Sequence, residues 1–146
     1  MDILTATQRS YCMSRIRGKD TRPEVQLRKA LWALGIRYRL ESKLKGRPDL
    51  VLARIKVAVF VDGCFWHCCP KHFTMPRTRR AFWKNKITGN CERDRAVDVA
   101  LRRAGWLVLR IWEHEVTSNL PRVCGRLVRA FDARAQRQMP HQKGAR

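Results

Sequence analysis

The sequence has few acidic residues and no long apolar run. Only 12 of its 146 residues are Asp or Glu, against 32 Lys and Arg, so its formal net charge is +20 and its isoelectric point about 11.1. An excess of this size favours a polyanionic partner, and nucleic acid is the commonest one. No apolar stretch approaches the ~20 residues that a membrane-spanning helix needs. We therefore expect a nucleic-acid-binding protein with no membrane association, the alternative being a basic protein without such a partner.

Two further absences narrow the class. The first residues, MDILTATQRSYC, lack the charged and then apolar segments of a secretory signal, so we expect a cytoplasmic protein. In a reducing compartment the six cysteines are thiols or metal ligands and not a disulfide framework. No glycine-rich phosphate loop follows an apolar stretch, which excludes a doubly wound dinucleotide-binding fold.

The apolar periodicity predicts one α/β domain over residues 1–146, with a core from about 8 to 134 and mobile ends. Helices are predicted at 22–34, about 78–104 and about 119–134, and strands at 36–40, 49–53, 55–62 and 106–112. Thr21 and Glu24 have the spacing of a capping box at the start of the first helix. Because strand 106–112 follows a helix, a right-handed crossover makes it parallel to strand 55–62. The expected architecture is three-layered, with helices flanking a mixed central sheet.

A compact group of residues has the chemistry of a zinc site. Three ligands fall within nine residues, namely Cys64, Cys69 and His72. A structural zinc site needs a fourth. His114 is the best candidate, because it follows strand 106–112 and parallel neighbours end at the same edge of a sheet. Cys68 and Cys124 are rivals for that position, and the alternative to a metal site is a set of buried, inert cysteines.

Carboxylates suggest a second metal site. Asp49 follows a turn in the phrase GRPD, at the start of a strand that pairs with strand 55–62. A carboxylate there is suited to Mg²⁺, which prefers oxygen ligands. Glu24 could join the site through a water, or act only in the helix cap. Asp94 has two readings, an acid behind the site or a solvated helix residue, and we expect the latter.

One histidine and two aromatic pairs complete the candidates. His67 lies too close to Cys64 to be a comfortable zinc ligand, and its near-neutral pKa suits a general base, the alternative being a structural histidine. The adjacent rings at 65–66 stand in the predicted zinc loop, where they could be presented outward to unstack base pairs. The pair at 82–83 repeats the pattern. For both pairs the alternative is burial in the core.

Six phrases spread over about residues 8–130 match one family in the same order. They are MSRIRGKDTRPE (13–24), GRPD (46–49), VDGCFWHCCPKHF (61–73), FWKNKI (82–87), ERDR (92–95) and GWLVLRIWEHE (105–115). On these phrases the chain resembles the very-short-patch repair (Vsr) DNA mismatch endonucleases. The resemblance implies a restriction-endonuclease-like fold with a structural zinc site.

The same resemblance implies a function. Such enzymes nick one strand of double-stranded DNA on the 5′ side of the thymine in a T:G mismatch left by deamination of 5-methylcytosine, which starts repair. A Mg²⁺-dependent monomer in the bacterial cytoplasm, associated with the nucleoid, is expected, with other mismatch-repair proteins as candidate partners. The alternatives are a restriction-type nuclease specific for a sequence, and a zinc-stabilised DNA-binding protein without catalysis.

The resemblance also implies roles for individual residues. Asp49 would bind Mg²⁺ together with the backbone carbonyl of Val61, His67 would be the general base, and Glu24 the acid on the first helix. Nucleases of this fold often carry a lysine two residues after an acid on the second catalytic strand, but this chain reads Asp62-Gly63-Cys64 there. The zinc ligands would be Cys64, Cys69, His72 and His114. The aromatic residues that intercalate beside the mismatch would be Phe65, Trp66 and Trp83. From the residues themselves we add Phe82 as a DNA contact, and Arg15, Arg17, Arg47 and the arginines of 77–80 as phosphate contacts.

Overall fold

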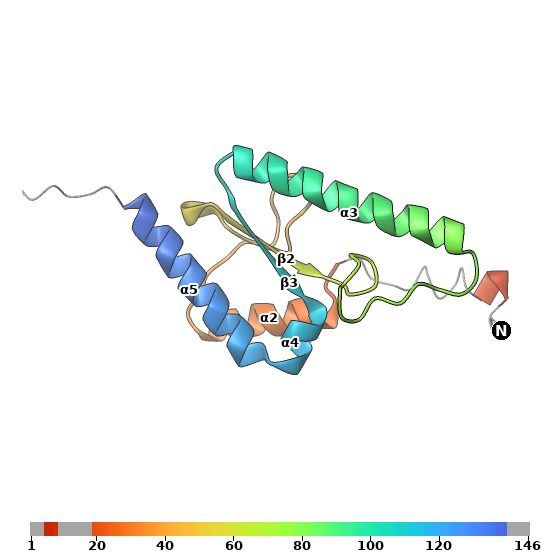
Figure 1. Ribbon diagram of the computed structural model, residues 1–146. Helices are drawn as coiled ribbons and strands as arrows, with labels where there is room; N and C mark the ends of the chain where they lie inside the picture. Colours follow the sequence, from red (N-terminus) through yellow and green to blue (C-terminus); the bar gives the residue numbers. More distant parts are fainter. Residues whose placement is uncertain (1–4, 9–18, 140–146) are drawn as a thin grey trace, which may run out of the picture.

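A computed structural model describes residues 5–8 and 19–139 (Figure 1). Within these residues, no helix is long and apolar enough to cross a membrane. The elements, in chain order, are α2 (Arg22–Ala33), β1 (Leu50–Leu52), the 3₁₀ turn η1 (Ala53–Ile55), β2 (Val57–Asp62), α3 (Arg80–Arg103), β3 (Leu107–Trp112), α4 (Glu113–Ser118) and α5 (Leu120–Gln138).

The three strands form a mixed sheet in the order β1-β2-β3. Strand β1 pairs antiparallel with β2, placing Leu50 opposite Val59, and β2 pairs parallel with β3, placing Asp62 opposite Trp112. The crossover between the parallel strands is α3, as the sequence predicts. Because β2 and β3 end at the same edge, the loop after Asp62 and helix α4 begin side by side.

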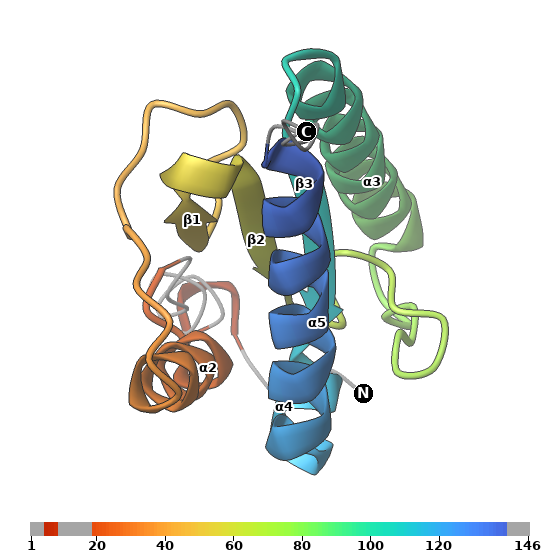
Figure 2. The same ribbon diagram turned by 90° about the vertical axis from the view of Figure 1, so that its left-hand side faces the viewer.

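Helices cover both faces of the sheet, which gives three layers (Figures 1 and 2). On one face, α2, α4 and α5 enclose a core whose centre includes Leu27, Val59 and Leu127. On the other face, α3 covers a smaller cluster around Phe60 and Leu101. Alternate residues of β2 and β3 supply the two clusters, since side chains of a strand point to opposite faces in turn.

Several predicted elements differ from the structure. Residues 36–40 form no strand, only a single bridge between Arg39 and Val51. The hydroxyl of Tyr38 donates to the carbonyl of Arg28 at 2.8 Å, so this segment packs along α2 and meets the sheet at one residue. The strand predicted from residue 55 begins at Val57, because η1 and the left-handed Lys56 separate β1 from β2.

The helix boundaries also need correction. Helix α3 begins at Arg80, after Arg79 in a left-handed conformation, and α5 runs to Gln138, four residues beyond its predicted end. The short helix α4 was not predicted. The predicted mobile ends fall mostly outside the described residues, as do Arg15 and Arg17.

Candidate active site

Four cysteine and histidine side chains meet where β2 and β3 end. The ligand atoms of Cys64, Cys69, His72 and His114 all lie within 4.8 Å of one another. His114 Nδ1 is 3.2 Å from the sulfur of Cys64 and 3.6 Å from that of Cys69, and His72 Nδ1 is 3.8 Å from the sulfur of Cys69. Helix α4 positions His114, and its Glu113 accepts a hydrogen bond from the Cys64 N–H at 3.0 Å.

This donor set fits a tetrahedral metal ion. Two thiols and two imidazoles at these separations are a combination that structural zinc sites use. Burial raises the pKa of the Cys64 thiol to about 11, so a cation is what would favour its thiolate. The rivals do not join the group: Cys68 is exposed, with a positive φ of 59°, and Cys124 points from α5 into the apolar core.

Asp49 and Glu24 form a close carboxyl pair beside the start of β1. Asp49 Oδ2 accepts from the N–H of Val61 at 2.6 Å, and Glu24 Oε2 accepts from the N–H of Asp20 at 2.9 Å. Burial raises the pKa of Asp49 to about 7; the Val61 hydrogen bond opposes this, while the charge and hydrogen bonding of Glu24 add to it. A buried carboxyl beside a half-buried one suits a hard divalent cation, which would remove their repulsion.

The position of Glu24 corrects the predicted capping box. Thr21 is the N-cap residue of α2, but its side chain makes no capping hydrogen bond. Glu24 reaches back one residue further, to the N–H of Asp20, and is 5% exposed. A carboxylate held in this way faces Asp49 across the site instead of closing the helix end on Thr21.

A cavity of about 660 Å³ opens beside the carboxyl pair. Basic side chains line it together with Glu24 and Asp49, namely Lys19, Arg28 and Arg47. A cavity lined by both acidic and basic side chains is suited to a phosphodiester and a metal ion together.

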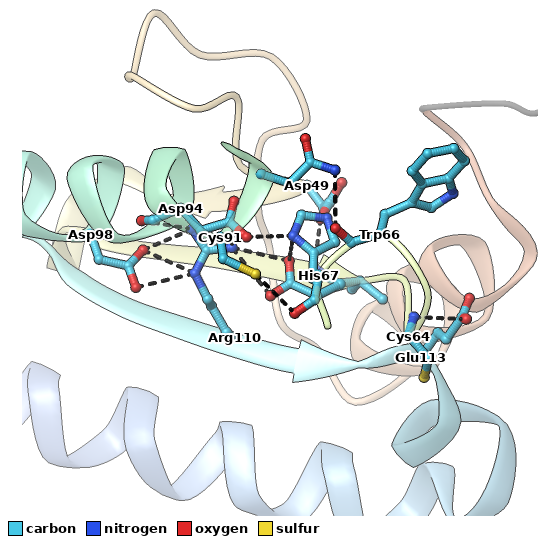
Figure 3. A network of polar contacts seen from close by, with 12 residues as sticks. Asp49, Cys64, Trp66, His67, Cys91, Asp94, Asp98, Arg110 and Glu113 are labelled. Atoms are coloured by element: carbon cyan, nitrogen blue, oxygen red, sulfur yellow. Dashed lines mark hydrogen bonds and ion pairs between the residues drawn. The ribbon is translucent and has the colours of Figure 1, made fainter. Parts of the chain in front are cut away.

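His67 lies close to acidic residues from two elements, and Figure 3 shows Asp94 beside its ring. Its Nδ1 is 2.5 Å from Oδ2 of Asp94 on α3 and 3.9 Å from Oδ1 of Asp62 at the end of β2. The loop around it is also fixed, because the His67 carbonyl accepts from the Cys91 thiol at 3.8 Å and Asn90 donates to the Trp66 carbonyl at 3.0 Å. Asp94 is therefore a partner of His67, and its prediction as a solvated helix residue is wrong.

Sequence reasoning missed Arg110 altogether. Its guanidinium lies under α3 and binds Asp62 and Asp98, and Figure 3 shows it reaching from β3 toward that helix. Burial acts to lower the pKa of Arg110, but its hydrogen bond with Asp98 and the charge of Asp62 raise it overall. The available signal was a single charge inside the apolar run WLVLRIW, since a buried arginine requires acidic partners.

The four aromatic residues of the predicted pairs, Phe65, Trp66, Phe82 and Trp83, gather into one group. Trp83 is the centre of the group, with ring centroids 5.4 Å from Phe65, 6.0 Å from Trp66 and 5.2 Å from Phe82. None of them belongs to either apolar core, so the alternative of core burial is wrong for both pairs. Three of these rings and His67 line a cavity of about 570 Å³, together with Lys86, Asn90, Arg93 and Asp94. Their contact with DNA stays a prediction.

Comparisons with known proteins define first the class and then the family. Type II nicking enzyme V.NaeI of Lentzea aerocolonigenes is 50% identical over 113 residues, which are 73% of this chain and 68% of the relative. Type II nicking enzyme V.NmeDIP of Neisseria meningitidis serogroup C is 45% identical over 124 residues, 82% of each chain. These similarities place the protein among the DNA endonucleases.

The family follows from two further matches. DNA mismatch endonuclease Vsr of Escherichia coli (strain K12) is 39% identical over 114 residues, which are 77% of this chain and 73% of the relative. The family model described as DNA mismatch endonuclease Vsr matches residues 1–72. The chain belongs to this Vsr family, and its mixed sheet with flanking helices is consistent with that membership.

Proposed function

We propose that the protein nicks one strand of double-stranded DNA on the 5′ side of the thymine in a T:G mismatch, such as deamination of 5-methylcytosine leaves. Family membership supports mismatch-directed cleavage of DNA, and the name of the relatives, nicking enzyme, favours cleavage of one strand. The observation that carries the proposal is that the last residues of β2 connect two acidic groups: the N–H of Val61 binds Asp49, whose neighbour is Glu24, and the next residue, Asp62, lies 3.9 Å from the His67 that pairs with Asp94.

Asp49 and Glu24 would hold Mg²⁺, with the carbonyl of Val61 as a further ligand. Asp49 Oδ2 and Glu24 Oε2 each accept one backbone hydrogen bond, which fixes both carboxylates and leaves their other oxygens for the cation. When bound, Mg²⁺ would neutralise charge on the phosphodiester and favour ionisation of a water. The cations around this cavity, Arg47 among them, would orient the DNA backbone.

His67 would act as the general base toward the attacking water. With Nδ1–H donated to Asp94, the lone pair of Nε2 is the basic site of the imidazole. Asp94 fixes the tautomer and the ring orientation and would stabilise the imidazolium that forms, as the acid does in other His–Asp pairs. This arrangement supplies a base although Cys64 stands where nucleases of this fold often carry a lysine.

The aromatic group would select the mismatch. Trp66 and Trp83 are neither in the core nor fully exposed, and they line one cavity together with His67 and the exposed Phe82. Inserting such rings into a duplex costs the unstacking of a base step, which is cheaper at a wobble pair than at a matched pair. The Cys/His cluster, which we assign to Zn²⁺, would anchor the loop that carries Trp66 and His67.

The test is nicking of strand-labelled duplexes that contain T:G or T:A within a cytosine-methylation site, with and without added Mg²⁺. We expect Mg²⁺-dependent cleavage of the thymine strand in the T:G duplex alone. Equal cleavage of both duplexes would favour the restriction-type nuclease, and tight binding without cleavage would favour the non-catalytic DNA-binding protein. Either of these outcomes would overturn the proposal.

A further inference from the structure

A buried charge lies in the middle of β3 where its neighbours are apolar. Arg110 stands opposite Phe60 in the parallel register, and its guanidinium carbon is 4.2 Å from the centroid of that ring. The side chain is only 20% exposed. Burying a guanidinium is unfavourable unless acids and hydrogen-bond acceptors surround it, so a strand would not carry one there for packing alone.

Acidic residues from β2 and α3 supply those partners. Arg110 donates from Nε and Nη2 to Asp98 Oδ1 at 2.9 and 2.8 Å. Its Nη1 binds both oxygens of Asp62, at 3.0 and 3.2 Å. Toward Asp94, Nη2 contacts the backbone carbonyl at 3.5 Å and Nη1 lies 3.8 Å from Oδ1. One guanidinium thus connects the sheet to two successive turns of α3.

This connection decides which acid engages His67. Asp62 Oδ1 and Asp94 Oδ2 both approach Nδ1 of His67, at 3.9 and 2.5 Å. Arg110 takes both oxygens of Asp62, and of these two acids Asp94 is the one within hydrogen-bond distance of the imidazole. We propose that Arg110 is a positioning residue for the cleavage reaction: it holds Asp62 away from His67 and fixes Asp94 against it. The inference rests on the proposed function, since it assumes that His67 acts in cleavage.

Arg110 also supplies the positive charge that this group of acids needs. Asp62, His67 and Asp94 have ligand atoms within 4.8 Å of one another, as a cation site would. The guanidinium already lies on Asp62, and it contacts Asp94 and Asp98 as well. Without it, three neighbouring carboxylates would repel one another, and α3 would carry Asp94 away from the imidazole.

The experiment measures single-turnover nicking and DNA affinity separately. We expect Arg110→Met to lower the single-turnover rate on T:G duplex about 10–100-fold, the usual effect of removing a group that orients another. DNA affinity should stay within about threefold, because the cations and aromatics that would contact DNA are unchanged. Arg110→Lys, which keeps the charge but not the fork of donors, should recover part of the rate.

A double-mutant cycle and a matched control separate positioning from folding. If Arg110 acts through Asp94, then Arg110→Met should slow the Asp94→Asn enzyme little further, because coupled residues are not additive. Arg134→Met is the control: Arg134 donates to the carbonyls of Ile55 and Gly105, at the opposite end of the sheet from His67. This variant should be less stable to heat but cleave at the wild-type rate.

Several results would overturn the inference. These are an unchanged rate in Arg110→Met, additive losses in the double mutant, or an equal loss of rate in Arg134→Met. If Arg110→Met does not fold, Asp98→Asn decides, since it removes one anchor of the guanidinium: slower cleavage with unchanged affinity supports the inference and an unchanged rate overturns it. If the wild type does not cleave T:G duplex selectively, the proposed function fails. If His67→Ala cleaves normally, the general-base role on which this inference rests fails; if His67→Ala is inactive and Arg110→Met is normal, only this inference fails.

Discussion

Replacing Asp49 by Asn should stabilise the metal-free protein while abolishing cleavage. Burial raises the pKa of Asp49 to about 7, opposed by the hydrogen bond from Val61 and assisted by the charge of Glu24. Asparagine has the same shape, and its amide oxygen can still accept from the Val61 N–H. The substitution therefore removes the charge and little else.

The magnitude follows from the difference between the folded and unfolded proteins. In the unfolded chain the Asp49 carboxyl has its ordinary pKa of 3.8, and in the folded protein a pKa of about 7. At a pH between these two pKa values the folded protein keeps the Asp49 proton that the unfolded chain has lost. The free energy of unfolding therefore falls as the pH rises from about 4 to about 7. The shift of about 3 units, at ~1.4 kcal/mol each, sets an upper limit of roughly 4 kcal/mol. Because Glu24 shares the repulsion, we expect Asp49→Asn to gain about 2–4 kcal/mol at pH 8.

Urea unfolding of both proteins from pH 4 to pH 8 measures this gain. No chelator should be present, since it would also strip the Cys/His cluster. The difference should grow with pH, and added Mg²⁺ should narrow it by stabilising the wild type alone. Asp132→Asn, at an exposed position on α5, is the matched control and should change little. A difference independent of pH, or an Asp49→Asn protein less stable than the wild type at pH 8, would refute this reasoning.

Three other predictions concern metal, DNA and salt. Cys64→Ser should lose bound zinc and unfold at a lower temperature, as metal analysis and thermal melts would record. Cys68→Ser, at an exposed position, should keep its zinc and the wild-type melting temperature. Trp83→Ala should weaken binding to T:G duplex by about 1–3 kcal/mol, measured by titration, whereas Trp32→Ala, a half-exposed ring on α2, should not. Affinity should fall linearly on a plot of log K against log salt, and Arg47→Ala should make that slope shallower by about 1. The first expectation is contradicted if Cys64→Ser retains zinc, and the second if Trp83→Ala and Trp32→Ala lose equal affinity. The third is contradicted if the salt slope of Arg47→Ala is unchanged.

Much of the fold could be predicted because its signals are local. The apolar runs of β2 and β3 and the helix between them predicted a parallel pair, and parallel strands end at one edge. That rule alone predicted that His114 lies beside Cys64, although the two residues are 50 positions apart in the sequence. The resemblance to the Vsr family added the roles of individual residues and was confirmed by the comparisons.

The remaining features depend on tertiary contacts that no local pattern carries. The segment 36–40 alternates like a strand, yet the hydrogen bond of Tyr38 to α2 leaves it only one bridge to the sheet. Asp94 reads as a solvated helix residue until α3 is placed over the loop that carries His67. Arg110 could be recognised as an anomaly in an apolar strand, but its partners come from two other elements.

The most direct test of the central claim is single-turnover nicking of T:G duplex by wild type, Asp49→Asn and His67→Ala, with DNA affinity measured alongside. We predict that both variants bind the mismatch with nearly unchanged affinity and lose cleavage by at least about 100-fold, as expected for removal of a metal ligand or a general base. If either variant cleaves T:G duplex at the wild-type rate with unchanged affinity, the assignment of the active site to the end of β2 is contradicted.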